Sequence, residues 1–360
     1  MSKSSDFQPN WASTPGDTIA DILKERDLSL QLFAKKMNSS IDYTKELIHG
    51  YISITEDIAK RLETVLGASA EFWLRREAKY RESINRIGHL AEEKWLNELP
   101  INDMVAFGWL ERTNNLIEEC LKYFEVRDIW TWRRKYNDVI ALTAFRKSTT
   151  IKSIPASVSA WLRQGEIQSM AIPCQPWNSV LFTEILPKIK QLIKKKKPID
   201  FINELKNICA GCGVAVAIVK TPKGCTASGA TKFISPNKAM VLLSFRYLSD
   251  DHFWFTFFHE AAHLLLHSNK TLFIEEDDEN FRNNIYEKEA NQFATEVLIP
   301  KHLQVRLRTM RIDKREIMNV AKEADVSLGI IVGQLQHIGR VDFKNLNSFK
   351  RRYSWKDILL

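Results

Sequence analysis

Residues 253–267 read FWFTFFHEAAHLLLH, an apolar run with three histidines and one glutamate inside it. The run predicts a helix, and because apolar residues flank the polar ones on both sides, this helix should be buried. Positions i and i+4 of a helix lie about 40° apart around the axis and about 6 Å apart along it. His259 and His263 should therefore project from one face, where both imidazoles can bind a single metal ion.

Glu260 directly follows His259, so residues 259–263 have the HExxH pattern. In zinc peptidases the glutamate of this pattern removes a proton from a water molecule on the metal. The alternative is a helix whose histidines and glutamate form ordinary hydrogen bonds within the core. A buried, unpaired carboxylate would be costly, however, and a divalent cation with its water is the simplest compensation. We therefore expect a Zn2+ cofactor, with Glu260 as the catalytic base.

A catalytic zinc ion usually takes a third protein ligand and keeps one position open. His267 lies about 12 Å from His259 along a helix axis, which is too far to share the ion easily. In the metzincin pattern the third ligand would come six residues after His263, but that residue is Asn269 and no glycine breaks the helix before it. The remaining possibility is an acidic residue on the next helical segment, residues 285–298.

Residues 287–294 read EKEANQFA and offer two acidic candidates. Glu287 and Asn291 are one helical turn apart and share a face with Ala294. Glu287 can therefore bind the metal while Asn291 accepts the second ring N–H of a ligand histidine. Glu289 should point about 200° away from this face, into solvent.

Taken together, FFHEAAHLLLH (257–267) and EKEANQFATEVLIP (287–300) resemble the ImmA/IrrE family of metallo-endopeptidases. The HExxH and ExxAxxFA blocks of that family match His259, Glu260, His263, Glu287, Ala290, Phe293 and Ala294. The resemblance covers about residues 161–340 and implies a zincin-like metallopeptidase domain with a C-terminal helical part. It also implies that the protein substrate is a transcriptional repressor or an antitoxin.

Near the N-terminus, residues 14–83 show apolar positions at helical spacing in five short runs, separated by capping residues and glycines. LSLQLFAKKMNSSIDYTKELIHG (28–50) resembles the XRE-type helix-turn-helix, in the version found in HigA-like antitoxins. The following block, ITEDIAKRLETVLGASAEFWLRREAKY (54–80), continues the same resemblance. The chain is thus expected to join a five-helix DNA-binding domain to the peptidase domain.

In such domains the helix after the turn enters the major groove of DNA. That helix is expected at residues 41–49, and the candidate DNA contacts are Ser40, Tyr43, Lys45 and His49. The segment also carries two acidic residues, and residues 1–82 have a net charge of −1 although phosphate contacts normally supply most of the affinity for DNA. The alternative is therefore a helical docking or dimerisation domain that keeps only the fold. A homodimer through the helix-turn-helix domain is a candidate assembly.

Composition excludes several other classes of protein. Of 360 residues, 44% are hydrophobic and 27% are charged, which is typical of soluble globular domains. The most apolar stretch, residues 253–266, is too short to cross a bilayer, and the first ten residues lack the apolar region of a secretion signal. Five cysteines with a single CxxC at 209–212 predict free thiols in a cytoplasmic protein. The net charge of +8 is concentrated in residues 301–360, which carry +7.

The expected fold class is mainly α with a small β-sheet, whose two strands should be residues 214–219 and 240–245. The expected organisation is a flexible leader (1–13), the helix-turn-helix domain (14–83), a helical connector (84–160), the peptidase domain (161–340) and a basic tail (341–360).

Two functions fit these features. One is a zinc endopeptidase fused to a DNA-binding module, with His252, Arg282 or Tyr286 as a candidate donor to the oxyanion. The other is a HigA-like antitoxin and transcriptional regulator in which the metal domain is structural or binds a partner.

Overall fold

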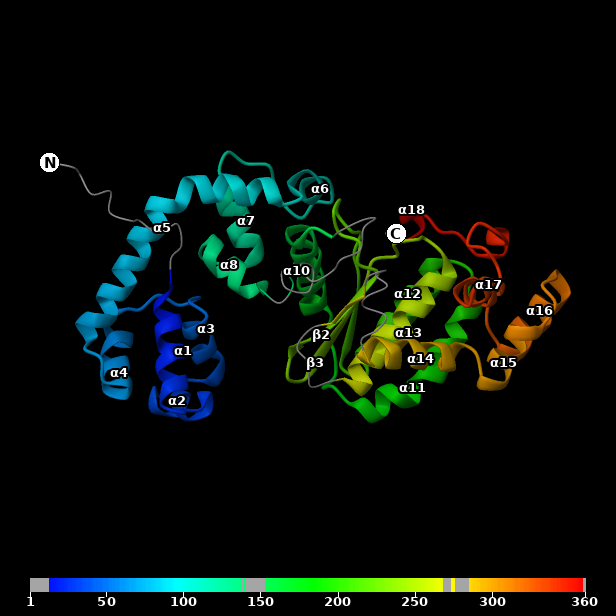
Figure 1. Ribbon diagram of the computed structural model, residues 1–360, viewed down its shortest axis with the longest axis horizontal. Coiled ribbons are helices and arrows are strands. Elements are labelled where there is room, and N and C mark those ends of the chain that lie inside the picture. Colours follow the sequence, from blue (N-terminus) through cyan, green and yellow to red (C-terminus); the bar gives the residue numbers. More distant parts are fainter. Residues whose placement is uncertain (1–12, 138, 140–152, 268–272, 276–284, 359–360) are drawn as a thin grey trace. The chain divides into compact units, whose positions relative to one another are not determined.

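A computed structural model of the chain describes residues 13–137, 139, 153–267, 273–275 and 285–358 (Figure 1). The chain divides into two compact units, Met1–Ala141 and Leu142–Leu360. Both are rich in helices and the second contains a small sheet, which confirms the predicted α+β class. Among the described residues, no helix combines the length and the apolar character that crossing a membrane requires.

The N-terminal unit begins with the five helices that the sequence predicts: α1 (Pro15–Glu25), α2 (Leu30–Lys36), α3 (Ile41–Ile48), α4 (Glu56–Leu66) and α5 (Ala70–Glu98). Each begins after a serine or threonine whose hydroxyl accepts a backbone N–H of the first turn: Thr14, Ser29, Ser40, Thr55 and Ser69. Their apolar faces enclose one core around Ile19, Phe33, Leu62 and Trp73, all with 0% exposure. Capping residues and apolar spacing together therefore account for this part of the fold.

Three further helices complete the unit: α6 (Ile101–Ala106), α7 (Leu116–Phe124) and α8 (Ile129–Lys135). α7 and α8 pack on the distal part of α5 through an aromatic cluster in which the Trp95 ring lies 5.6 Å from that of Trp132 and 6.0 Å from that of Phe124. Arg134 of α8 donates to the backbone oxygen of His49 at 2.9 Å, so this helical group also contacts the end of α3.

The second unit is built on a four-stranded sheet in the order β1-β3-β2-β4. Its strands are β1 (Val214–Ile218), β2 (Gly229–Ser235), β3 (Lys238–Leu243) and β4 (Phe273–Glu275). β1 and β3 pair in parallel, and the other pairs are antiparallel. The two predicted strands correspond to β1 and β3. β2 was missed because GATKFIS opens on glycine and lacks a continuous apolar run, and β4 is only three residues long.

Helices cover both faces of this sheet (Figure 1). The helices that precede β1 are α10 (Pro155–Ala171), α11 (Ser179–Gln191), the short η1 (Leu192–Lys194) and α12 (Pro198–Ala210). α13 (Asp250–Leu266) and α14 (Ile285–Leu298) follow the main strands. Because strand side chains alternate between faces, Val216 and Val241 lie in the core that includes α13, whereas Leu242 packs against Gly165 of α10. The metal-binding pattern therefore lies on a helix held directly against the sheet.

The boundary proposed at residue 161 falls within α10, which starts at Pro155 and packs as a whole on the sheet. The final helices are α15 (Lys301–Thr309), α16 (Lys314–Ala324), α17 (Leu328–His337), η3 (Asn347–Phe349) and α18 (Trp355–Ile358).

Residues 341–360, expected to form a basic tail, require a correction. Tyr353 and Ile358 are each only 9% exposed and belong to the main core. The backbone N–H of Arg351 donates to Oδ1 of Asp250, and its guanidinium donates to the backbone oxygen of Ile193. The basic residues around position 351 thus attach the segment to the core rather than marking a free tail.

Candidate metal centre

The pattern HExxH lies on α13, a buried helix as its sequence predicts. From Asp250 to Leu264, nearly every side chain of α13 is buried. Apolar neighbours fill the core on one side, while His259, Glu260 and His263 are 1%, 0% and 2% exposed. Such burial of three polar side chains requires compensating partners.

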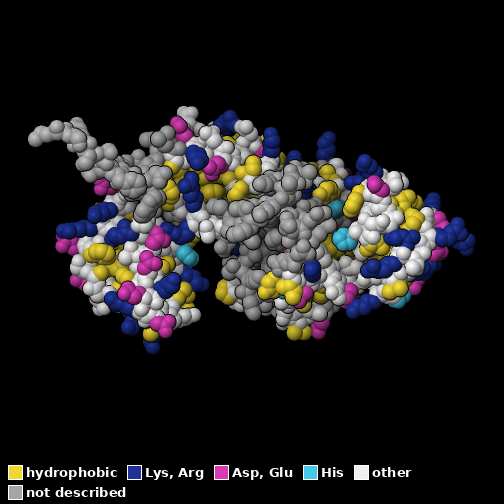
Figure 2. Space-filling model, in the orientation of Figure 1, with side chains coloured by type: hydrophobic (Ala, Val, Ile, Leu, Met, Phe, Trp, Pro, Cys, Tyr) yellow, Lys and Arg dark blue, Asp and Glu magenta, His cyan; other side chains and the backbone are white. Residues whose placement is uncertain are grey.

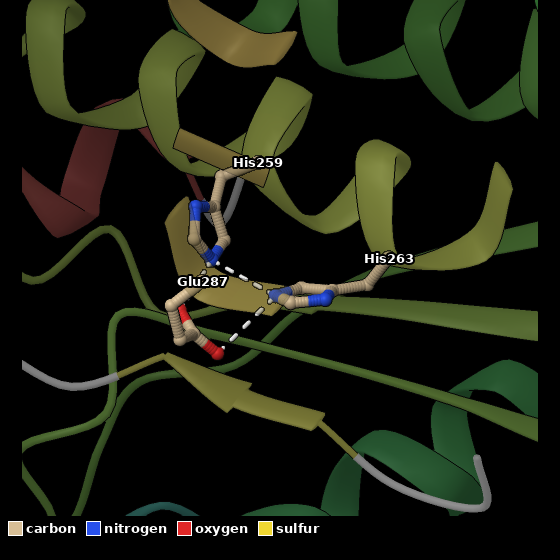
Figure 3. A group of neighbouring side chains, drawn as sticks. All are labelled: His259, His263 and Glu287. Atoms are coloured by element: carbon tan, nitrogen blue, oxygen red, sulfur yellow. Dashed lines mark hydrogen bonds and ion pairs between the residues drawn. The ribbon is translucent and has the colours of Figure 1, made fainter. Parts of the chain in front are cut away.

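Two imidazoles and one carboxylate converge on a common point (Figure 3). Nε2 of His259 lies 3.0 Å from Nε2 of His263. Oε2 of Glu287, on α14, lies 3.2 Å from Nε2 of His259, and its Oε1 lies 3.5 Å from Nε2 of His263. Among the residues that the structure describes, this is the one cluster of histidine, cysteine and carboxylate groups with metal-binding proximity.

The spacing of these three groups fits a zinc ion. Zinc bonds of about 2.0–2.2 Å at tetrahedral angles place neighbouring ligand atoms about 3.3–3.5 Å apart. The separations of 3.0, 3.2 and 3.5 Å among the donor atoms are close to these edges. Two neutral imidazoles and one carboxylate also form a donor set that zinc takes in catalytic sites, with a fourth position left for water.

The other ring nitrogen of each histidine has a partner. Nδ1 of His259 lies 3.0 Å from Oδ1 of Asn291, as the sequence predicts. Nδ1 of His263 lies 3.0 Å from Nδ1 of His267. In both histidines Nε2 is the atom that faces the common point, so the hydrogen bonds at Nδ1 orient the rings.

His267 and Glu289 also belong to this hydrogen-bond network, and the sequence does not predict their part in it. Nε2 of His267 lies 2.8 Å from Oε2 of Glu289. His267 does not share the ion site, as expected, but Glu289 is not simply solvated: its side chain is 49% exposed and paired. The sequence signal that was overlooked is the spacing of His263 and His267, again four residues apart on α13.

Burial and pairing keep the ligand groups in the forms that bind metal. Burial lowers the pKa of His263 to about 4, so its imidazole is neutral near pH 7. Burial alone would raise the pKa of Glu287, but hydrogen bonds and charge interactions with His259 and His263 outweigh this effect and lower it to about 2. Glu287 is therefore ionised at neutral pH.

Glu260 lies against a glycine of the sheet. A Cβ atom at Gly229, the first residue of β2, would lie only 2.5 Å from Oε1 of Glu260 and 2.7 Å from a methyl carbon of Thr256. Since these contacts are too short for any side chain, the space for the Glu260 carboxylate depends on this glycine. Sequence reasoning did not identify Gly229, because the strand that contains it was not predicted.

A cavity of about 440 Å³ opens beside the metal-binding cluster. His259, Glu287 and Asn291 form one side, and residues from α17 and the C-terminal segment, including Phe343 and Arg352, also line it. The cavity can therefore bring a substrate to the metal position.

The three candidate oxyanion donors differ in position. His252 lines the cavity. The ring of Tyr286 packs against His267 with 4.9 Å between centroids. Arg282 lies outside the described residues.

The four candidate DNA contacts lie on or beside α3. Ser40 caps the helix, and its Oγ accepts the N–H of Tyr43 at 3.0 Å. Tyr43 is half-buried, whereas Lys45 is exposed and lies 3.8 Å from Asp42. Partial burial, followed by the positive charges of Arg134 and Lys45, lowers the pKa of His49. Figure 2 shows Lys and Arg side chains interspersed with Asp and Glu on the visible face of this unit, without a region of one sign.

Comparisons with known proteins agree with both parts of the sequence analysis. Residues 215–335 match the peptidase M78 family model, described as the IrrE N-terminal-like domain. A 60-residue stretch is 35% identical to the "Uncharacterized HTH-type transcriptional regulator YddM" of Escherichia coli (strain K12). That match covers 17% of this chain and 64% of the relative, so the chain spans less than two thirds of the relative's length.

Proposed function

From the premise that residues 215–335 carry an IrrE N-terminal-like domain, we propose that this chain is a zinc-dependent endopeptidase fused to a DNA-binding helix-turn-helix. The observation that carries the proposal is the convergence of His259, His263 and Glu287 beside a cavity. The proposed substrate is a repressor or antitoxin protein, whose removal would change transcription. The proposed location is the cytoplasm.

The chemistry follows from the side chains around this point. A bound zinc ion would supply Lewis acidity, making a water molecule more acidic and polarising the carbonyl of the scissile peptide bond. Glu260 accepts the proton of the attacking water and passes it to the amine that leaves. His263 stays neutral, and Asn291 holds the His259 ring in place through Oδ1.

The burial of Glu260 favours a catalytic role over a structural one. Its side chain is 0% exposed, and the sheet carries a glycine where any larger residue would collide with the carboxylate. An alanine or leucine would fill the same position without burying a charge. Proton transfer would account for a carboxylate at this buried position.

The proposal is tested with purified full-length protein. We expect one zinc ion per chain by elemental analysis, and cleavage of a repressor or antitoxin encoded beside this chain's gene. Glu260→Gln should retain zinc and lose cleavage by about 100-fold or more, since general-base catalysis contributes on this scale. His263→Ala should lose both. Protein without stoichiometric zinc, or cleavage unchanged in Glu260→Gln, would reject the enzyme.

A second candidate function follows from the helix-turn-helix resemblance and the match to a transcriptional regulator. In this alternative the protein is a HigA-like antitoxin and regulator that binds DNA as a homodimer, and its metal domain is structural or binds a partner. A mobility-shift assay with its own promoter should then show a complex that weakens steeply with salt. The double substitution Tyr43→Ala and Lys45→Ala should weaken this complex, and failure to form it at low salt would count against DNA binding.

A further inference from the structure

We propose that His267 and Glu289 form a positioning pair that fixes the tautomer and the ring orientation of the metal ligand His263. The pair extends from the ligand as a continuous chain of hydrogen bonds. Nδ1 of His263 lies 3.0 Å from Nδ1 of His267, and Nε2 of His267 lies 2.8 Å from Oε2 of Glu289. Neither residue belongs to the metal-binding cluster itself.

The carboxylate of Glu289, at the outer end of these hydrogen bonds, sets their directions. A carboxylate can only accept, so Nε2 of His267 carries a hydrogen and donates it to Glu289. A neutral imidazole with hydrogen on Nε2 has a lone pair on Nδ1, which then accepts from Nδ1–H of His263. His263 is thereby left with its lone pair on Nε2, the atom that faces His259 and Glu287. With a neutral His267, this chain of hydrogen bonds selects the His263 tautomer that can bind a metal ion.

The chain of hydrogen bonds is buried at His267, near the metal position, and half-exposed at its outer end, Glu289. His267 directly follows α13, its backbone N–H donates to the backbone oxygen of His263 at 3.0 Å, and its side chain is 3% exposed. The ring of Tyr286 packs across it at an angle of 82°. Glu289 is half-exposed, so its carboxylate also contacts solvent.

α14 contacts His259 and His263 of α13 and the histidine that follows this helix, His267. Glu287 faces the two ligands, Asn291 accepts from His259, and Glu289 pairs with His267. Docking of one helix thus completes the cluster and orients both ligand rings. The two ligands differ, however: His259 is oriented by a neutral amide, and His263 by an imidazole backed by a carboxylate.

A metal-binding assay separates orientation from simple packing. The inference rests on the proposed function, because it takes zinc as the ion that His263 binds. Zinc affinity is measured by competition with a chromogenic chelator, and cobalt substitution reports ligand geometry through its visible absorption. His267→Leu removes both hydrogen bonds and should weaken zinc binding about 10–100-fold, the range typical of residues that orient ligands. His267→Gln offers both an acceptor and a donor, and should recover at least half of this loss on a logarithmic scale.

Glu289→Ala leaves the buried ring in place and tests the outer end of the chain. We expect a weaker loss of zinc affinity, about 3–10-fold, because water can replace a half-exposed carboxylate. Glu296→Ala is the matched control, since it removes a partly exposed carboxylate that pairs with Lys301 near the end of the same helix. It should leave zinc affinity and the cobalt spectrum unchanged.

The outcomes distinguish this inference from the proposed function. If the unmodified protein binds no zinc, the proposed function itself fails. If it binds zinc but His267→Leu binds equally well, or His267→Gln is no better than His267→Leu, the positioning pair is overturned. Should His267→Leu fail to fold by circular dichroism, Glu289→Ala against Glu296→Ala decides: equal affinities overturn the pair, and a loss confined to Glu289→Ala supports it.

Discussion

At the scale of single residues, the site depends both on side chains that can bind a metal ion and on a glycine that leaves space for the catalytic carboxylate. Gly229 contributes no side chain, yet a Cβ there would lie 2.5 Å from Oε1 of Glu260. The pattern HExxH identifies the residues that carry the chemistry, but not Gly229 of β2, which leaves space for Glu260.

Replacing Gly229 with alanine should displace the Glu260 carboxylate. Because a shift of about 1 Å in a reacting group can reduce a rate about 100-fold, we expect peptidase activity to fall by at least about 10-fold. Zinc content should stay at the unmodified level, since the three ligands come from α13 and α14. Ser235→Ala at the exposed end of the same strand is the control and should behave normally. Full activity in Gly229→Ala would show that the Glu260 carboxylate does not need the space that Gly229 leaves.

Proton binding to His263 should affect stability once the metal is removed by chelation. Burial lowers its pKa to about 4 from 6.5, so between these pH values the unfolded chain binds more protons than the folded one. Stability from this residue is therefore complete above pH 6.5 and is lost as the pH falls toward 4. We expect a decrease of about 2 kcal/mol in the free energy of unfolding between about pH 8 and about pH 5.

Urea unfolding of the chelated protein, followed by tryptophan fluorescence, measures this decrease. His263→Gln cannot titrate in this range, so its unfolding free energy should depend less on pH. An identical pH dependence in the two proteins would contradict the assignment.

At the scale of elements, α3 shows how one residue can have two interpretations. Ser40 is a candidate DNA contact, but its hydroxyl already caps α3 by accepting the N–H of Tyr43. The structure supports the capping role directly, while contact with DNA stays a prediction. The two roles respond differently to substitution.

Ser40→Ala should destabilise the N-terminal unit by about 1 kcal/mol, because the helix loses its capping acceptor. Ser40→Asp should keep the cap and the stability, while its negative charge should weaken any complex with DNA. Thermal unfolding and mobility shifts of both variants provide the measurements. If Ser40→Ala is as stable as the unmodified protein, the Ser40 cap does not stabilise α3.

At the scale of the whole molecule, the second unit is held together by segments far apart in sequence. The C-terminal segment lies against the start of α13, where Arg351 bonds to Asp250 and Tyr353 packs on aromatic residues of the core. The ring of Tyr353 lies 5.7 Å from that of Phe245 and 6.1 Å from that of Phe201. The end of the chain therefore stabilises the same helix that carries the metal ligands.

Tyr353→Ala should lower the free energy of unfolding of this unit by about 3 kcal/mol, as expected for truncating a buried aromatic side chain. Phe343→Ala is the matched control, because this aromatic residue of the same segment is 70% exposed and should change stability little. Thermal or urea unfolding measures both. Similar stabilities for the two variants would indicate that the segment contributes little to the core.

Much of this architecture is readable from local patterns. The five N-terminal helices follow from apolar spacing and capping residues, and β1 and β3 follow from short aliphatic runs. In the metal cluster, helical spacing alone brings His259 and His263 together, and one helical turn relates Glu287 to Asn291. The contact of Glu289 with His267 could not be read in this way, because it depends on how α14 docks against the end of α13.

Sequence patterns alone predict the five N-terminal helices, the buried helix with the HExxH pattern and the face that His259 and His263 share. They also single out Glu287 as the third candidate ligand. Those features depend on neighbours within a few residues, where helical geometry sets the distances. Three contacts could be seen only in the folded protein: Gly229 borders Glu260, Glu289 pairs with His267, and residues near 353 belong to the core. These contacts join segments separated by tens of residues, and their distances are set by the packing of helices and strands against one another.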